Sequence, residues 1–203
     1  MLTAGVDEAG RGPLAGPVVA AAVLWSDAYR LEGLTDSKKL SAAQRNRLRT
    51  ELEQLLPEGH WAVGSASPAE IDEVNILQAT YLAMHRAIEQ LKPAPALLLV
   101  DGNRFKAYSG IAHRCEVKGD ARFAAISAAS IFAKTERDRI MHELHAEFPQ
   151  YGWDRNMGYP SPGHRAALEQ HGPCAWHRRS FAWKPSQLRP ELCSELLPLR
   201  SPR

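Results

Sequence analysis

Short apolar runs alternate along the chain with longer segments in which apolar residues recur at helical spacing. The apolar runs predict buried strands at residues 2–6, 18–25, 61–67 and 96–100, with one more short strand at 113–117. Strands that alternate with amphipathic helices are typical of a mixed α/β fold, here a mixed β-sheet flanked by helices.

Capping signals mark where the helices begin. Ser41 with Gln44 forms a capping box before a helix that extends to about Leu56, and Ser67 with Glu70 forms a second one. Periodic apolar residues predict further helices over about 76–91, 120–147 and 164–170. The proline-rich segment after Lys184 is expected to be a partly flexible tail.

The length of 203 residues and an apolar content of 44% fit one globular domain. No apolar run reaches the roughly 20 residues of a membrane span, and no basic and apolar leader begins the chain, so we expect a cytoplasmic protein. The cysteines Cys115, Cys174 and Cys193 are far apart, which indicates neither a disulfide framework nor a zinc site. A monomer is expected because no coiled-coil or repeat signal is present.

The net charge is only +2, so any affinity for nucleic acid requires a local basic patch. Basic residues cluster at 104–122, 134–139 and 177–179. Each cluster by itself is interpreted as a solvated face.

Four carboxylates follow predicted strands or open a predicted helix. Asp7 and Glu8 follow the first strand, Asp101 follows the 96–100 strand, and Asp120 stands at the start of the 120–147 helix. If these groups converge at one edge of the sheet, their mutual repulsion requires cations or protons. Oxygen ligands favour two Mg²⁺ or Mn²⁺ ions, an arrangement that hydrolyses phosphodiesters. The alternative is that they are solvated groups or helix caps.

A glycine turn follows the first pair of carboxylates. Gly10 and Gly12 allow close approach of the backbone and offer N–H donors to a phosphate or a sugar hydroxyl. The spacing of Gly10, Gly12 and Ala15 also matches a dinucleotide fingerprint, but a strand rather than a helix follows it. A nucleotide-dependent enzyme is therefore the weakest reading of this turn.

With these motifs the chain resembles the type 2 ribonucleases H, and more narrowly the bacterial ribonuclease HII group. The resemblance rests on blocks in family order across about residues 2–184: GVDEAGRGPLAGPV (5–18), DSKKL (36–40), IDEVNIL (71–77), VDG (100–102), KGD (118–120), AASI (128–131), GYP (158–160) and HRRSF (177–181). Ser127, Thr135 and Glu136 depart from the family pattern.

The resemblance implies a ribonuclease H-like domain over 1–184, in which about 148–184 forms a small helical C-terminal element of the substrate groove. It also implies an endonuclease that hydrolyses RNA in RNA–DNA hybrids and nicks 5′ of single ribonucleotides in duplex DNA, leaving 3′-hydroxyl and 5′-phosphate ends. Such an enzyme would serve ribonucleotide excision repair and removal of RNA primers. A non-catalytic module that binds RNA–DNA hybrids remains the alternative.

By the matched motifs, Asp7, Glu8, Asp101 and Asp120 would be the catalytic residues and would bind two Mn²⁺ or Mg²⁺ ions. The backbone of Gly10, Arg11 and Gly12 would read the ribose 2′-hydroxyl, and Tyr159 would stack on the sugar. Lys38, Lys39 and Lys118 would contact phosphates.

Overall fold

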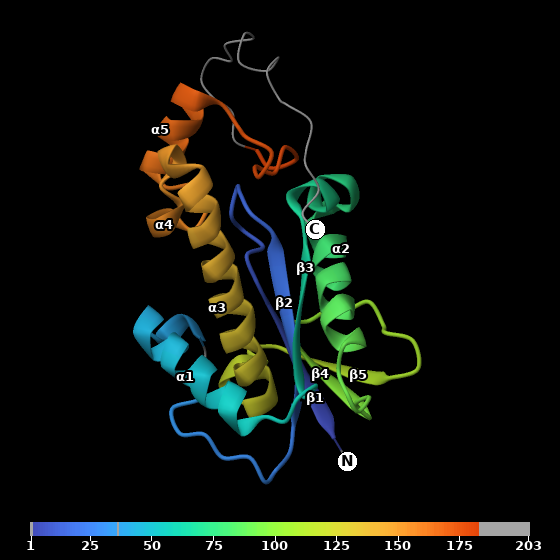
Figure 1. Ribbon diagram of the computed structural model, residues 1–203. Coiled ribbons are helices and arrows are strands. Elements are labelled where there is room, and N and C mark those ends of the chain that lie inside the picture. The colour runs from blue at the N-terminus through green and yellow to red at the C-terminus, as the bar shows by residue number, and fades with distance from the viewer. Residues whose placement is uncertain (1, 36, 183–203) are drawn as a thin grey trace.

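The computed structural model describes residues 2–35 and 37–182, which form a five-stranded mixed sheet of order β3-β2-β1-β4-β5 with helices on both faces (Figure 1). The strands are β1 Thr3–Ala9, β2 Val18–Trp25, β3 Trp61–Ala66, β4 Leu97–Asp101 and β5 Ala112–Glu116. The α-helices are α1 Ala42–Leu55, α2 Pro68–Glu89, α3 Ala124–Glu147, α4 Trp153–Asn156 and α5 Pro162–His171. Short 3-10 helices are η1 Ser37–Lys39, η2 Gly119–Ala121 and η3 Pro149–Tyr151.

The predicted strands and helices are confirmed, and two boundaries differ in a way that bears on the site. The first strand was expected to end at Val6, but β1 continues to Ala9. Asp7 and Glu8 therefore lie within the strand, and alternation of side chains sends them to opposite faces of the sheet. Antiparallel pairing with β2 keeps the strand extended here, with Asp7 opposite Ala21 and Glu8 opposite Ala20.

The long helix also begins later than expected. Asp120 belongs to the separate 3-10 helix η2, and α3 starts only at Ala124, after the N-cap residue Phe123. Asp120 is therefore not the N-cap residue of the long helix, a position that Phe123 occupies.

Parallel pairing of β1 with β4 places the two carboxylate-bearing strand ends side by side. The register aligns Val6 with Val100, so Asp7 and Asp101 are the next residues along adjacent strands. The helix α3 packs closely on β1, since a Cβ added to Gly5 would lie 2.1 Å from the backbone carbon of Ala125. This close contact holds the start of α3, and η2 before it, near the same strand.

The buried residues form three clusters, and Figure 1 shows the layers that they join. One lies between the sheet and α2, a second between the sheet and the helices α1 and α3. The third joins the end of α3 to α4, α5 and the turn between β1 and β2. Within the described chain, no helix is both long and apolar enough to cross a membrane. The tail predicted over 185–203 lies outside the described residues.

Candidate active site

The structure brings the four predicted carboxylates to one end of the β1–β4 pair. Asp7 is 7% exposed within β1, and Asp120 is 7% exposed in η2. Asp101, the last residue of β4, is half-buried, and its Oδ1 accepts a 2.8 Å hydrogen bond from the N–H of Gly119. This bond connects β4 directly to the turn that bears Asp120.

Asp7 interacts electrostatically with each of the other three carboxylates. Burial and the negative charges of Glu8, Asp101 and Asp120 raise the pKa of Asp7 well above its ordinary value. A 2.7 Å hydrogen bond from the N–H of Glu8 acts in the opposite direction but does not offset them. The side chain of Asp7 is therefore close enough to each of the other three carboxylates to be repelled by it.

Glu8 points to the other face of the strand, where it meets a cation. Nη1 of Arg11 lies 3.2 Å from Oε1 of Glu8, and the Arg11 side chain is 51% exposed. An ion pair this exposed contributes little to stability. It leaves Arg11 at the surface, within reach of a ligand.

The chemistry of the donor set fits hard divalent cations. All four groups are carboxylates, which are ligands suited to Mg²⁺ or Mn²⁺. Burial and the neighbouring carboxylates raise the pKa of Asp7, so a bound cation would relieve their repulsion. Among the described residues, no three Asp, Glu, His or Cys side chains are arranged to hold an ion as they stand. The four side chains thus suit a divalent cation by their negative charge and their oxygen atoms, and not by a ready-made coordination geometry.

Two adjoining hollows open beside three of these carboxylates, Asp7, Glu8 and Asp101. One, of about 230 Å³, is lined by Asp7 and Ser130, by the turn residues Gly10 to Gly12, and by Lys134 and Tyr159. The other, of about 350 Å³, is lined by Asp101, Gly102 and Arg104. Glu8 and Arg11 line both hollows, so they form one groove across the end of β1.

Tyr159 stands over the glycine turn. Its ring is 46% exposed, and a Cβ added to Gly12 would lie 3.7 Å from its Cε1 atom. An exposed aromatic ring beside open backbone amides suits a sugar or a base that stacks on the ring.

The predicted phosphate-binding lysines lie in or next to the 3-10 helices η1 and η2. Lys38 and Lys39 belong to η1, and Lys118 is an exposed residue in the left-handed conformation before η2. Lys39 and Lys118 do not line either hollow, whereas Lys134 does. Lys134 belongs to the basic cluster at 134–139, which the sequence pattern by itself indicated as a solvated face.

The interpretation of the basic clusters as solvated faces is wrong for Arg137 and Arg178, which are at most 1% exposed. His177, next to Arg178, is also buried. Burial lowers the pKa of Arg137 to about 10 and, together with the charge of Arg137, that of Arg178 to about 9. Both guanidinium groups therefore remain charged at neutral pH, inside the protein.

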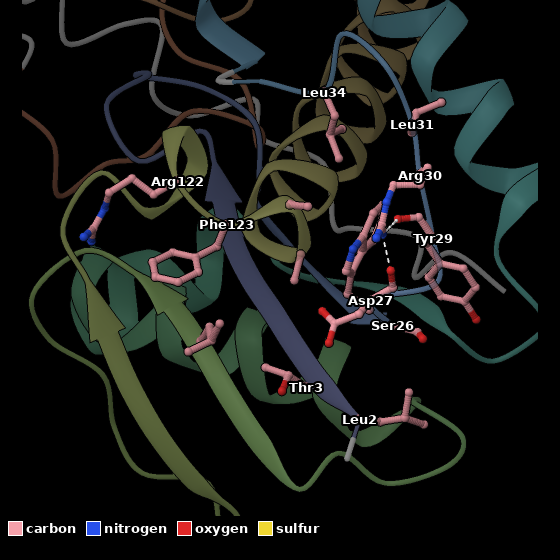
Figure 2. A pocket seen from close by; sticks show the side chains of 14 residues that line it. Leu2, Thr3, Ser26, Asp27, Tyr29, Arg30, Leu31, Leu34, Arg122 and Phe123 are labelled. Carbon is pink, nitrogen blue, oxygen red and sulfur yellow. Dashed lines mark hydrogen bonds between the residues drawn. The ribbon is translucent and has the colours of Figure 1, made fainter.

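A hollow of about 630 Å³ lies away from the carboxylates, around the start of β1 and the start of α3 (Figure 2). Leu2, Thr3, Arg30 and Phe123 line it, and Figure 2 shows Arg30 turned back onto the backbone of its own loop. None of the four carboxylates lines it, so it is separate from the candidate active site.

A family model described as Ribonuclease HII matches residues 4–184 of the chain. A ribonuclease HII from Phocaeicola vulgatus is 53% identical over 183 residues, covering 89% of each chain. A ribonuclease HII from Porphyromonas gingivalis is 54% identical over 177 residues, covering 87% of each chain.

Solved structures agree with these matches. The ribonuclease HII of Archaeoglobus fulgidus, solved with PCNA, superposes with a TM-score of 0.76 at 29% identity, covering 93% of this chain and 98% of that one. Ribonuclease H2 of Pyrococcus horikoshii OT3 gives a TM-score of 0.74 at 30% identity, covering 89% of this chain and 94% of that one. Bst-RNase HIII in complex with Mn²⁺ shares the fold, with a TM-score of 0.66 at 17% identity over 84% of this chain and 61% of that one.

Proposed function

The chain belongs to the ribonuclease HII family, and on that premise we propose that it nicks duplex DNA 5′ of a single embedded ribonucleotide as well as cutting the RNA strand of RNA–DNA hybrids. The products carry 3′-hydroxyl and 5′-phosphate ends. This activity serves removal of misincorporated ribonucleotides and of RNA primers.

One observation carries the proposal: four carboxylates repel one another beside a turn that presents backbone amides and a tyrosine ring. A module that only binds duplexes gains nothing from four negative charges next to phosphates. A metal-dependent nuclease requires them.

Asp7, Glu8, Asp101 and Asp120 hold two Mg²⁺ or Mn²⁺ ions in this proposal. Bound ions of this kind activate the attacking water and stabilise the leaving oxygen. The hydrogen bond from Gly119 to Asp101 fixes one carboxylate, and burial between β1 and α3 fixes Asp7. Two of the proposed oxygen ligands are thus held in place by the protein itself.

The rest of the groove selects and orients the substrate. The N–H groups of the Gly10–Gly12 turn bind the ribose 2′-hydroxyl, which distinguishes RNA from DNA. Tyr159 stacks on the neighbouring sugar, and Arg11 and Lys134 neutralise phosphates at the groove wall. Chemistry and sugar recognition therefore meet at adjacent nucleotides.

The test is a nicking assay with Mg²⁺ or Mn²⁺ on three duplexes of the same sequence: all-DNA, DNA with one ribonucleotide, and full RNA–DNA hybrid. We expect a nick 5′ of the ribonucleotide, cleavage of the hybrid, and no cleavage of the all-DNA duplex. Folded protein that binds the hybrid in a salt-sensitive manner without cutting any strand would instead support the hybrid-binding alternative.

A further inference from the structure

A buried guanidinium group lies directly behind the glycine turn. We propose that Arg178 is a positioning residue, which turns the backbone N–H groups of Arg11 and Gly12 toward the groove. The inference rests on the proposed function, because it explains how that turn is held ready to read a 2′-hydroxyl.

All three guanidinium nitrogens of Arg178 donate hydrogen bonds to carbonyl oxygens of this turn. Its Nη2 donates to the carbonyl oxygen of Gly10 at 2.6 Å, its Nη1 to that of Arg11 at 3.0 Å, and its Nε to that of Gly16 at 3.0 Å. The side chain is fully buried, and within the described residues it forms no salt bridge. A buried charge without a carboxylate partner is costly, so these three acceptors provide its compensation.

Because peptide groups are planar, these hydrogen bonds also set the direction of the next N–H groups along the chain. In a trans peptide the C=O of one residue and the N–H of the next point in opposite directions. Since the carbonyls of Gly10 and Arg11 point inward to Arg178, the N–H groups of Arg11 and Gly12 point away from it. Both residues are exposed and line the groove, and in the described chain neither N–H donates to a backbone or side-chain acceptor.

The turn cannot hold this shape by its own hydrogen bonds. Pro13 and Pro17 lack an N–H, and Gly10 adopts a left-handed φ of 91° that leaves no room for a side chain. A Cβ at Gly10 would lie 2.0 Å from Nε of Arg137, the second buried arginine. Arg137 holds the other end of the turn through the carbonyls of Ala15 and Pro17, at 3.1 Å each.

The segment that bears Arg178 is itself anchored. Its N–H donates to the carbonyl of Leu14 at 2.8 Å, and the guanidinium carbon lies 5.1 Å from the ring centre of Phe181. Asp72 in α2 accepts the N–H groups of Arg179 and Ser180 at 2.8 and 2.9 Å. The backbone around Arg178 is therefore held both by the turn, at Leu14, and by α2, at Asp72.

The test compares Arg178→Lys, which keeps the charge but loses the fork, with Leu52→Ala, which removes a buried side chain in α1 away from the groove. Three quantities are measured: Tm, the single-turnover nicking rate on the one-ribonucleotide duplex, and Kd for the all-DNA duplex. For Arg178→Lys we expect nicking to be roughly 10- to 100-fold slower, the scale on which a misplaced backbone donor acts, with Kd within about twofold of the parent. Leu52→Ala loses Tm but keeps the nicking rate.

Nicking by Arg178→Lys at the parental rate would overturn the inference. So would an equal loss of nicking in Leu52→Ala at the same loss of Tm, or a loss of all-DNA affinity as large as the loss of nicking. A parent protein that nicks no duplex refutes the proposed function itself, which separates the two failures.

A second pair keeps the test decisive if Arg178→Lys does not fold. Gly12→Ala retains the N–H and meets only ordinary contact with Tyr159. Gly12→Pro removes the N–H and also fixes φ, so its Tm is measured beside its nicking rate. We expect nicking to fall at least tenfold further in Gly12→Pro than in Gly12→Ala. Equal rates in the two variants would show that this N–H does not read the substrate.

Discussion

Burial and neighbouring charge act together on the carboxyl group of Asp7. Its burial, and then the negative charges of three other carboxylates, raise its pKa because both oppose its ionisation. Such a residue lowers the stability of the ion-free protein, and this effect can be measured directly.

Asp7→Asn should stabilise the protein in EDTA at neutral pH by about 1 kcal/mol, because the amide removes a buried charge and can still accept the N–H of Glu8. Added Mg²⁺ should raise Tm in the parent and raise it less in the variant. Urea denaturation and thermal melts measure both effects. An unchanged or lower free energy of unfolding in Asp7→Asn would contradict the electrostatic account.

Asp101→Asn should reduce nicking by roughly three orders of magnitude, because lost metal affinity removes several kcal/mol of transition-state stabilisation. The amide oxygen can still accept the N–H of Gly119, so the fold should be retained and duplex affinity should change little. Single-turnover nicking and fluorescence anisotropy measure the two quantities. Asp27→Asn, at an exposed carboxylate lining the separate hollow, is the matched control and should nick normally.

At the level of elements, α3 joins the site to the rest of the molecule. It packs on β1 at Gly5, and it contributes Ser130, Lys134 and Arg137 to the groove. Its departures from the family pattern also have structural consequences. Thr135 and Glu136 both bind Nη1 of Arg49 at 3.1 Å, so these two residues tie α1 to α3.

Ser127→Ala should stabilise the protein by about 1 kcal/mol. In the described residues the Ser127 hydroxyl is buried without a hydrogen-bond partner, and an unsatisfied buried polar group is destabilising. Ser130→Ala is the matched control: its hydroxyl donates to the carbonyl of Ser127 at 2.9 Å, so its loss should be neutral or destabilising. Chemical denaturation of both variants tests this, and destabilisation by Ser127→Ala would be the contrary result.

At the level of the whole molecule, the C-terminal element closes the groove through a buried polar network. His164 donates from Nδ1 to the carbonyl of Tyr159 at 2.9 Å, and its Nε2 lies 3.1 Å from Nε2 of His177. The N–H of Cys174 donates to Nδ1 of His177 at 3.0 Å, which requires that this nitrogen carry no proton. The network thus extends from residue 174 to the backbone of Tyr159, and it needs neutral imidazoles.

Stability should therefore fall in acid. Burial and the neighbouring His164 lower the pKa of His177 from 6.5 to about 3. The unfolded chain takes up a proton as the pH falls through about 6.5, whereas the folded state does so only near pH 3, so the contribution is complete above pH 6.5 and declines below it. The loss should be on the order of 2 kcal/mol by about pH 4.5.

The measurement is urea denaturation across this pH range for the parent and for His177→Gln. The difference between the two proteins isolates the histidine from the carboxylates that also titrate. We expect the variant to be less stable at neutral pH and to lose less stability in acid. Parallel pH profiles would contradict the role assigned to His177.

The sequence by itself determined the elements, because capping boxes, apolar runs and proline stops act over a few residues. Strand β2 spans Val18–Trp25 as predicted, and both capping boxes, at Ser41 and Ser67, are present. It also singled out the four carboxylates and the glycine turn, since charges that interrupt apolar runs require compensation. The metal and substrate roles of these residues stay predictions.

Tertiary structure alone decided which charges are surface groups and which are interior ones. Nothing in the local pattern separates Arg137 and Arg178 from solvated arginines, because five of the six backbone carbonyls that accept from them lie 120 or more positions away along the chain. The faces of Asp7 and Glu8 likewise depended on β2, whose pairing extends β1 past Val6. Burial and long-range hydrogen bonding are properties of the packed chain. They place Arg137 and Arg178 inside the protein, where both donate hydrogen bonds to the carbonyls of residues 10–17.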